Sequence, residues 1–333
     1  GERGLSILVQ LSMCKEARVA MYNSEGVAEW VCEALAKSGL ELEAAATVAR
    51  NLSDLGGQDN RPAMLKGGIV GALASVLQRE NDLESQGVNA ALFALANIAS
   101  HNASRPRLLR LPGLVHALVR VLKASEPNSK PLRGALVTLT NLSCHKENRV
   151  EMMDQGLTDL LITLSLTAGP ETKHLEATLI MLVNISAVKE CRVPMVEGGA
   201  AEAAVAVVQS SEAAGAACTK NLEIALKVVQ NLSAHPDTGA SLISRGALQV
   251  ALQCARDHQP GVSAVAAGVL SNLALHALGN APVRARLLAA GVIQALGQLI
   301  HKPERTGLSA AKAAAYLCSE GWGPVGAAWE GGA

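Results

Sequence analysis

One segment recurs along nearly the whole of this 333-residue chain, and its repetition limits the possible folds more than any other feature. The clearest copy runs from Ala135 to Gly156 and reads ALVTLTNLSCHKENRVEMMDQG. It holds the end of an amphipathic helix, a polar connection, a short helix beginning near Arg149, and a glycine that opens a longer apolar helix. Equivalent positions return every 41 to 47 residues. Such a period is typical of a solenoid, in which each unit buries its apolar face against its neighbours.

The asparagine at position 141 marks one anchor position in each repeat. Its equivalents are Gln10, Asn51, Asn97, Asn184, Asn231, Asn272 and Tyr316. Apolar residues stand two and five positions before every anchor and one position after it. These offsets place them on one stripe of a helix, which predicts the face that packs into the core. Two positions after the anchor every residue is Ser, Ala or Cys, which predicts close packing of neighbouring helices.

A glycine follows each of the first seven anchors by 15 to 19 residues and opens the longer helix. The seven glycines are Gly26, Gly68, Gly113, Gly156, Gly199, Gly246 and Gly291. Glycine reverses the chain direction without steric cost, so we expect the short helix to meet the long one steeply. A basic residue precedes six of these glycines by seven or eight positions: Arg18, Arg61, Arg105, Arg149, Arg192 and Arg284. Before Gly246, Thr238 and Gly239 stand in its place.

The composition argues against several classes of function. Aromatic residues make up 2% of the chain and the formal net charge is zero, so no nucleic-acid partner is expected. No apolar run has the length of a membrane span. Seven cysteines without a CxxC pair favour reduced thiols in the cytoplasm or the nucleus. No catalytic or phosphate-binding motif occurs, and the eight histidines lack metal-ligand spacing, so we predict no enzyme, cofactor or metal site.

With three helices per unit, an asparagine near the end of the third and a glycine opening the second, the chain resembles the armadillo repeat over residues 1–318. A HEAT array is the nearest alternative, but its units have two helices and no recurrent asparagine at this place. The resemblance implies an all-α, right-handed superhelix (solenoid) of about seven three-helix repeats, the first truncated. In that family the third helices line a concave groove that binds extended segments of partner proteins, and the asparagine contacts the peptide backbone.

The resemblance implies a partner-binding groove whose asparagines are Asn51, Asn97, Asn141, Asn184, Asn231 and Asn272. Phe93, Arg133, Glu176 and Lys227 are the neighbouring candidates for specificity, and their charges have no single sign. A primary amide suits the task because it pairs with backbone groups whatever the partner's sequence. The alternative is that each asparagine satisfies backbone groups where its own helix ends.

The sequence therefore predicts a non-enzymatic protein-protein interaction scaffold, a monomeric array within a larger chain or complex, in the cytoplasm or nucleus. One alternative is an architectural subunit of a cytoskeletal, ciliary or trafficking assembly that docks by its convex face. Another is a nuclear-transport adaptor, although the tryptophan that such adaptors have four residues before the asparagine is absent here. Residues 319–333, with Trp322 and Trp329, are expected to form a loose Gly-rich tail or to cover the end of the stack.

Overall fold

The computed structural model describes residues 2–215, 218–256, 259–302 and 304–319. All the regular structure in these residues is helical, with 22 α-helices and two short 3-10 helices. The prediction of an all-α array of three-helix repeats is confirmed. The predicted Gly-rich tail, with Trp322 and Trp329, lies outside the described residues except for Ser319. None of the described helices is long and apolar enough to cross a membrane.

Each repeat consists of a short first helix, a longer second helix and a third helix that carries the anchor. The first helices are α2 (Arg18–Tyr22), α5 (Asn60–Lys66), α8 (Arg105–Leu109), α11 (Asn148–Asp154), α14 (Lys189–Glu197), α17 (Gly239–Ser244) and α20 (Ala281–Ala289). The 3-10 helices η1 (Lys15–Ala17) and η2 (Asn102–Ser104) precede α2 and α8. The second helices are α3 (Val27–Leu35), α6 (Ile69–Arg79), α9 (Leu114–Ala124), α12 (Leu157–Thr167), α15 (Ala200–Ala214), α18 (Ala247–Ala255) and α21 (Val292–Leu299).

The third helices begin with α1, which stands alone before the first complete repeat. They are α1 (Glu2–Met13), α4 (Gly39–Ser53), α7 (Gln86–Ala99), α10 (Lys130–Ser143), α13 (Lys173–Ser186), α16 (Thr219–Ser233), α19 (Pro260–Leu275) and α22 (Glu304–Cys318). The predicted stripe is buried: on α7, Leu92, Leu95 and Ile98 are fully inaccessible to solvent. Truncating such a leucine to alanine typically costs about 2 to 5 kcal/mol of folding free energy.

The glycine that precedes each second helix has left-handed backbone geometry. All seven predicted glycines have φ between 75° and 95°. A side chain with a Cβ is strained in this conformation, so glycine is the residue that ends one helix and opens the next here. The prediction that these glycines reverse the chain direction is confirmed.

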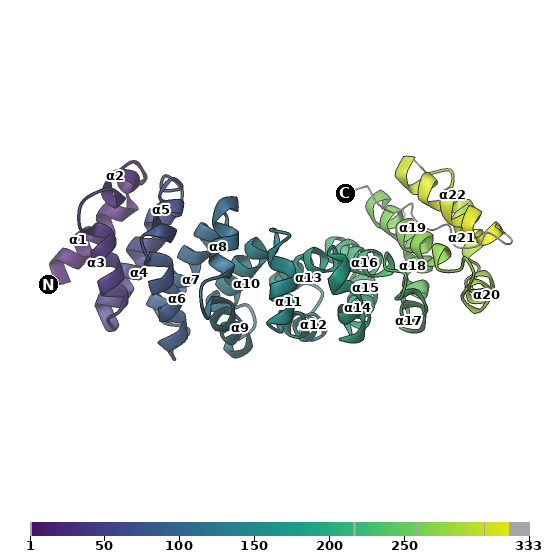
Figure 1. The fold of residues 1–333 in the computed structure, drawn as a ribbon, viewed down its shortest axis with the longest axis horizontal. Coiled ribbons are helices and arrows are strands. Elements are labelled where there is room, and N and C mark those ends of the chain that lie inside the picture. The colour runs from purple at the N-terminus through teal and green to yellow at the C-terminus, as the bar shows by residue number, and fades with distance from the viewer. Residues whose placement is uncertain (1, 216–217, 257–258, 303, 320–333) are drawn as a thin grey trace. The chain divides into compact units, whose positions relative to one another are not determined.

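The chain divides into two compact units, residues 1–160 and 161–333. The division falls within α12, which is labelled in Figure 1. In the first unit, α7 packs between α4 and α10. In the second unit, α16 packs between α13 and α19, and α22 packs on α19. Within each unit, neighbouring third helices therefore bring their anchor residues onto a common face. In each unit, we call the surface formed by its anchor asparagines and the residues one and two turns before them the ladder face of that unit.

Candidate functional site

The anchor asparagines form hydrogen bonds to the third helix of the preceding repeat. The amide nitrogen of Asn97 donates to the Arg50 carbonyl at 3.4 Å and to the Ser53 hydroxyl at 3.3 Å. The amide nitrogen of Asn272 donates to the Gln230 carbonyl and the Ser233 hydroxyl, both at 3.0 Å. In both cases the acceptors lie one position before and two positions after the preceding anchor. The amide donors thus join consecutive repeats.

The remaining anchors in the described contacts follow the same rule. The Asn231 amide nitrogen donates to the Val183 carbonyl and the Ser186 hydroxyl, both at 3.1 Å. Asn141 donates to the Ala96 carbonyl at 3.2 Å and has Ala99 where the other repeats offer a serine. Asn184 occupies the equivalent position on α13 and is half-buried like Asn141.

The serines two positions after the anchor have a polar role in addition to the predicted close packing. The hydroxyls of Ser53, Ser186 and Ser233 donate to the carbonyl three residues earlier in their own helix, at 2.8 to 3.0 Å. A hydroxyl that donates its proton keeps two lone pairs, so it also accepts the N–H of the next repeat's asparagine. The sequence signal was a column of small residues, which did not distinguish a hydroxyl acceptor from a methyl group.

The amide oxygens of the ladder remain available. In the described residues, no donor reaches Oδ1 of Asn97, Asn141, Asn231 or Asn272, and each of these side chains is half-buried. Because the N–H groups are held by the preceding helix, the amide orientation is fixed and the oxygen becomes a preoriented acceptor. Each oxygen can accept a hydrogen bond from a backbone N–H of another chain.

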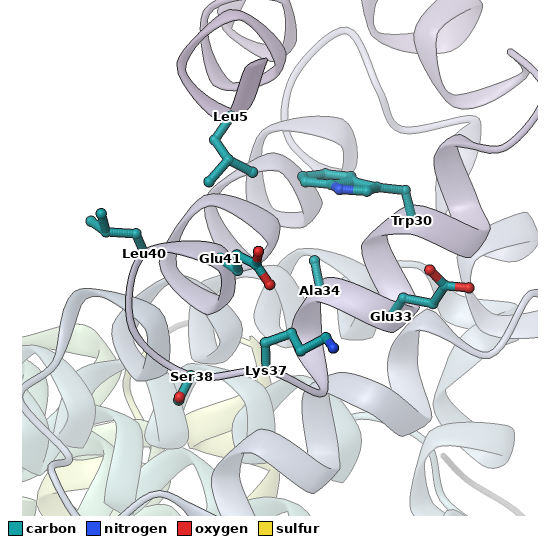
Figure 2. A pocket seen from close by; sticks show the side chains of 8 residues that line it. All are labelled: Leu5, Trp30, Glu33, Ala34, Lys37, Ser38, Leu40 and Glu41. Carbon is teal, nitrogen blue, oxygen red and sulfur yellow. The ribbon is translucent and has the colours of Figure 1, made fainter. Parts of the chain in front are cut away.

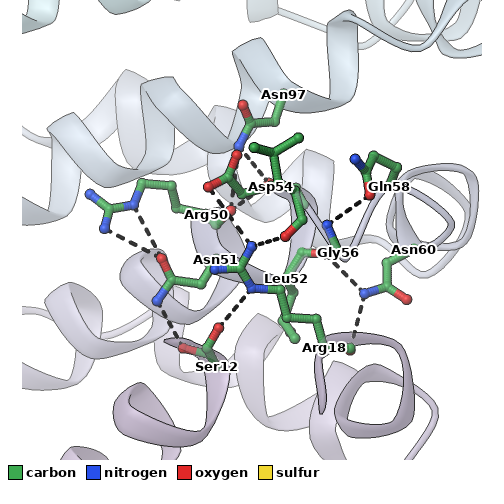
Figure 3. Close-up of polar contacts among 12 residues, drawn as sticks. Ser12, Arg18, Arg50, Asn51, Leu52, Asp54, Gly56, Gln58, Asn60 and Asn97 are labelled. Carbon is green, nitrogen blue, oxygen red and sulfur yellow. Dashed lines mark hydrogen bonds and ion pairs between the residues drawn. The ribbon is translucent and has the colours of Figure 1, made fainter. Parts of the chain in front are cut away.

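Asn51 differs from the other anchors (Figure 3). It is only 5% exposed. Its amide nitrogen donates to the Ser12 hydroxyl at 2.9 Å, and its oxygen accepts from the Arg50 guanidinium at 3.3 and 3.4 Å. Both ends of this amide are therefore satisfied within the chain.

The arginine column caps the third helices. The Nε of Arg18, Arg61, Arg105, Arg149 and Arg192 donates at 2.7 to 3.0 Å to the carbonyl two positions after the preceding anchor. A helix leaves its last carbonyls unsatisfied and carries partial negative charge at its C-terminus, so a guanidinium is well suited to this place. Burial lowers the pKa of Arg61 and Arg192. The sequence located this column but gave no indication of its role.

A second column of polar residues lies one position before the arginines, and sequence reasoning missed it. Asn60 and Asn148 are each 2% exposed and donate at 2.9 Å to the carbonyls of Leu52 and Leu142. The Thr238 hydroxyl donates to the equivalent Leu232 carbonyl at 2.7 Å. The available signal was the recurrence of short polar side chains directly before or at the start of the first helix.

The repeat without an arginine uses a histidine at the end of its own third helix, α19. His276 Nε2 lies 2.8 Å from the Ser233 carbonyl, which is the acceptor that an arginine takes in the repeats from α2 to α14. Arg284 Nε, in the repeat that begins with α20, has no hydrogen-bond partner in the described residues. A Cβ on Gly239 would lie 2.5 Å from the His276 ring carbon, so the glycine leaves room for the imidazole. Burial lowers the pKa of His276, although hydrogen bonds to the Ser233 and Pro236 backbones oppose this effect.

The other predicted site residues form local pairs. The Arg133 guanidinium carbon lies 5.3 Å from the centre of the Phe93 ring, so these two candidates come together across α7 and α10. Glu176 and Lys227 do not pair with each other. Glu176 forms an ion pair with Lys220 at 2.6 Å, and Lys227 forms one with Glu223 at 2.7 Å.

A cavity of about 570 Å³ lies apart from the ladder asparagines, between α1, α3 and α4 (Figure 2). Leu5, Trp30 and Leu40 provide its apolar lining, and Glu33, Lys37 and Glu41 its charged groups. Leu5 is a core position of the repeat, and its equivalents Leu92 and Leu136 are buried. In the described residues α1 packs against a third helix on one side only, which leaves Leu5 partly uncovered.

No protein-family model matches the chain, and no curated protein sequence matches it. Solved structures do match. A designed armadillo repeat protein matches with a TM-score of 0.62 at 23% sequence identity, over 74% of this chain and 99% of its own. An engineered protein matches with a TM-score of 0.69 at 16% identity, over 96% of this chain and 95% of its own. The chain has the armadillo-repeat fold.

A further match to this armadillo chain was solved with a ligand. It is a designed armadillo repeat protein in complex with the peptide (KR)4, with a TM-score of 0.61 and 23% identity, over 74% of this chain and 99% of its own. The armadillo fold accounts for the three-helix units, the glycine turns and the alignment of the third helices within each unit.

Proposed function

We propose that this armadillo chain is a non-enzymatic scaffold whose units each hold an extended segment of another protein along their ladder face. The observation that carries the proposal is the set of half-buried Oδ1 acceptors on Asn97, Asn141, Asn231 and Asn272. An acceptor that is already oriented loses little conformational freedom when a ligand binds, so more of the hydrogen-bond energy appears as affinity.

The proposed contact has a defined direction. Asn97, Asn231 and Asn272 each donate to two acceptors of the preceding repeat, so these amides would accept hydrogen bonds from the partner's backbone N–H groups and would not donate to its carbonyls. Asn141 donates to the Ala96 carbonyl alone and keeps one N–H group for a partner carbonyl. Such contacts are independent of the partner's side chains. Asn184 belongs to the proposed ladder by its position on α13. Asn51 does not, since both ends of its amide are satisfied within the chain.

Two further observations fit this function. The designed armadillo protein solved with (KR)4 carries a peptide on the same fold.

All seven cysteines are free thiols, and three of them, Cys191, Cys218 and Cys254, are buried. Free thiols are typical of a reducing compartment, so we assign the chain to the cytoplasm or the nucleus.

The test separates binding from stability by using the internal acceptor of each asparagine as the control. Binders are first selected on the whole chain from a display library of random 12-residue peptides (about that length spans several repeats). Their Kd is then measured on Asn97→Ala and Asn272→Ala, beside Ser53→Ala and Ser233→Ala. Each serine change removes one acceptor of the same amide and leaves Oδ1 in place.

The asparagine changes are expected to weaken binding by about 3- to 10-fold, the value of one neutral hydrogen bond. The serine changes are expected to lower the melting temperature and leave the Kd within about twofold. Asparagine variants that bind as tightly as the wild type, or serine variants that lose as much affinity, would contradict the proposal.

A further inference from the structure

We propose that the ladder face of the first unit selects a partner segment in which an acidic residue stands beside an apolar one. Arg133 would bind the carboxylate, and Phe93 with Val137 would contact the apolar side chain. The inference rests on the proposed function, because it assigns chemistry to the segment that the ladder holds.

The cation is held in place by an aromatic ring. Phe93 lies one turn before Asn97 on α7, and Arg133 lies two turns before Asn141 on α10. The guanidinium carbon stands 5.3 Å from the ring centre, which is within the range of a cation–π contact. A guanidinium that uses its flat face for such a contact keeps its edge N–H groups free for two parallel hydrogen bonds to a carboxylate.

No acidic group of the described residues neutralises this cation. Arg133 is exposed, and it has neither an ion pair nor a side-chain hydrogen bond there. The nearest charge along its own helix is Lys130, which is also exposed and basic. The local charge at the start of α10 is therefore positive and favours an acidic residue of the partner.

An apolar surface adjoins the cation. Val137 lies one turn after Arg133 and one turn before Asn141, and 39% of it is exposed. Phe93, on the neighbouring helix, is half-buried. Valine and phenylalanine on the ladder face present apolar area that a partner side chain would remove from water, which stabilises the complex.

The remaining charges on the ladder face of the first unit determine where along it an acidic partner residue is favoured. Glu43 stands on α4 in the same repeat position as Arg133, and its side chain lies beside the start of α7. Arg50 is engaged with the Asn51 oxygen. An acidic partner residue is thus favoured at α10 and opposed at α4, which sets the direction in which the segment lies.

The second unit lacks an equivalent free cation in the described contacts. Lys220 and Lys227 are paired with Glu176 and Glu223, at 2.6 and 2.7 Å. Gly268 stands at the position of Phe93, so there is no ring for a cation to stack on. The ladder face of the second unit would therefore hold the backbone of a segment bound there with little selection for an acid.

The experiment is a selection from the random peptide library on the wild-type chain and on Arg133→Glu. The wild type is expected to enrich Asp or Glu next to an aliphatic or aromatic residue, and Arg133→Glu to enrich Lys or Arg at that place. For one selected acidic peptide, Arg133→Glu should weaken binding by about fivefold or more, and less for the same peptide with Gln in place of Glu. Arg107→Glu, an equal charge change on α8, is the control and should have no effect.

Phe93→Ala and Phe93→Tyr test the ring. The alanine variant is expected to lose part of the acidic preference, because the guanidinium is no longer held, and the tyrosine variant to keep it. The outcomes are distinguishable from failure of the proposed function. A selection without binders, or binders insensitive to Asn97→Ala, would overturn both proposals. Binders that depend on Asn97 but are indifferent to the charge at position 133 would overturn this inference alone.

Discussion

At the scale of the residue, the recurrent polar side chains of this chain serve the ends of the third helices. The arginine of the first helix and the polar residue before it take carbonyls near the helix C-terminus. The anchor asparagine of the next repeat takes a carbonyl and a hydroxyl slightly earlier in the same helix. The last carbonyls of a helix lack intrahelical partners, so these donors satisfy groups that would otherwise be unpaired. In the described residues, the side-chain oxygens of Asn97, Asn141, Asn231 and Asn272 accept no hydrogen bond.

The capping arginine is expected to contribute measurably to stability. Arg105 donates to the Ala99 and Ser100 carbonyls at 2.9 and 3.2 Å, and Arg107, two residues later on α8, is exposed. We expect Arg105→Ala to lower the free energy of unfolding by about 1.5 to 3 kcal/mol, because hydrogen bonds from a charged donor are lost. Arg107→Ala should change it by less than about 0.5 kcal/mol. Urea unfolding followed by circular dichroism measures both, and equal effects would refute the capping role.

His276 is expected to make stability depend on pH. Burial lowers its pKa from 6.5 in the folded chain, so the unfolded chain takes up a proton at a higher pH than the folded chain does. Its contribution is fully present above pH 6.5 and is lost progressively as the pH falls below that value. Asp237 and His235 face the imidazole and act in opposite directions, the first raising and the second lowering its pKa.

The measurement is the melting temperature between about pH 7.5 and about pH 5.5. His276→Gln should reduce the loss of stability on acidification. Burial also lowers the pKa of His174, so part of the loss should remain. His116→Gln, on the exposed face of α9, is the control. If the melting temperature falls equally with pH in the wild type and in His276→Gln, the result would be inconsistent with a buried neutral imidazole.

At the scale of the element, the repeat that contains α17 replaces one capping device by another. In the other described repeats from α2 to α14 the arginine lies at or near the start of the first helix and reaches the preceding helix. Here α17 begins with Gly239, and the cap comes from His276 at the end of α19. The exchange conserves the hydrogen bond to the Ser233 carbonyl, but the donor lies 43 residues after its acceptor, compared with 6 residues for Arg18 and Ser12.

A double-mutant cycle tests this exchange. Gly239→Ala should destabilise the wild type by about 1 to 3 kcal/mol, because the added Cβ overlaps the imidazole. In the His276→Ala background the space is empty, and the same change should be neutral or stabilising, since alanine is favoured over glycine in a helix. The two changes therefore should not add. Additive effects in urea unfolding would indicate that the histidine does not fill this space.

The helical elements could largely be predicted from the sequence, and the polar contacts could not. The spacing of the leucines determines which face of a helix is buried, and the backbone freedom of Gly113 or Gly156 determines where the chain turns. Both effects are local, so the sequence of a single repeat is enough to predict them. Asn97 has two acceptors on another helix, the Arg50 carbonyl 47 residues earlier and the Ser53 hydroxyl 44 residues earlier. Which groups accept depends on how closely α4 and α7 approach. The resemblance implied an amide that both donates to and accepts from a peptide, but the donors here serve the preceding repeat.

The specificity candidates show the same limit. Phe93, Arg133, Glu176 and Lys227 were found by counting turns back from the anchor, which locates the ladder face. Counting does not reveal that Glu176 is neutralised by Lys220 and that Arg133 stacks on Phe93. Similarly, no local sequence pattern indicates that His276 replaces an arginine. The space for its ring exists because Gly239, 37 residues earlier, has no side chain.

At the scale of the whole molecule, each unit is stabilised by contacts between neighbouring repeats. The ladder hydrogen bonds join residues 39 to 48 positions apart, which is about one repeat. Stability in such an array is close to a sum of repeat and neighbour terms, so a local change on the ladder face need not unfold distant repeats. This property suits a scaffold, since binding residues are free to vary while the caps and glycines maintain the fold.

The central claim is that asparagine oxygens accept backbone N–H groups of a bound segment, and N-methylation of that segment tests it most directly. Each backbone N–H of a selected peptide is replaced in turn by N–CH₃, and the Kd is measured on the wild type and on Asn97→Ala. The account predicts that a few methylations weaken wild-type binding by about tenfold. One of these penalties should shrink on Asn97→Ala, whose acceptor is gone. Penalties that are identical on the two proteins would contradict the account.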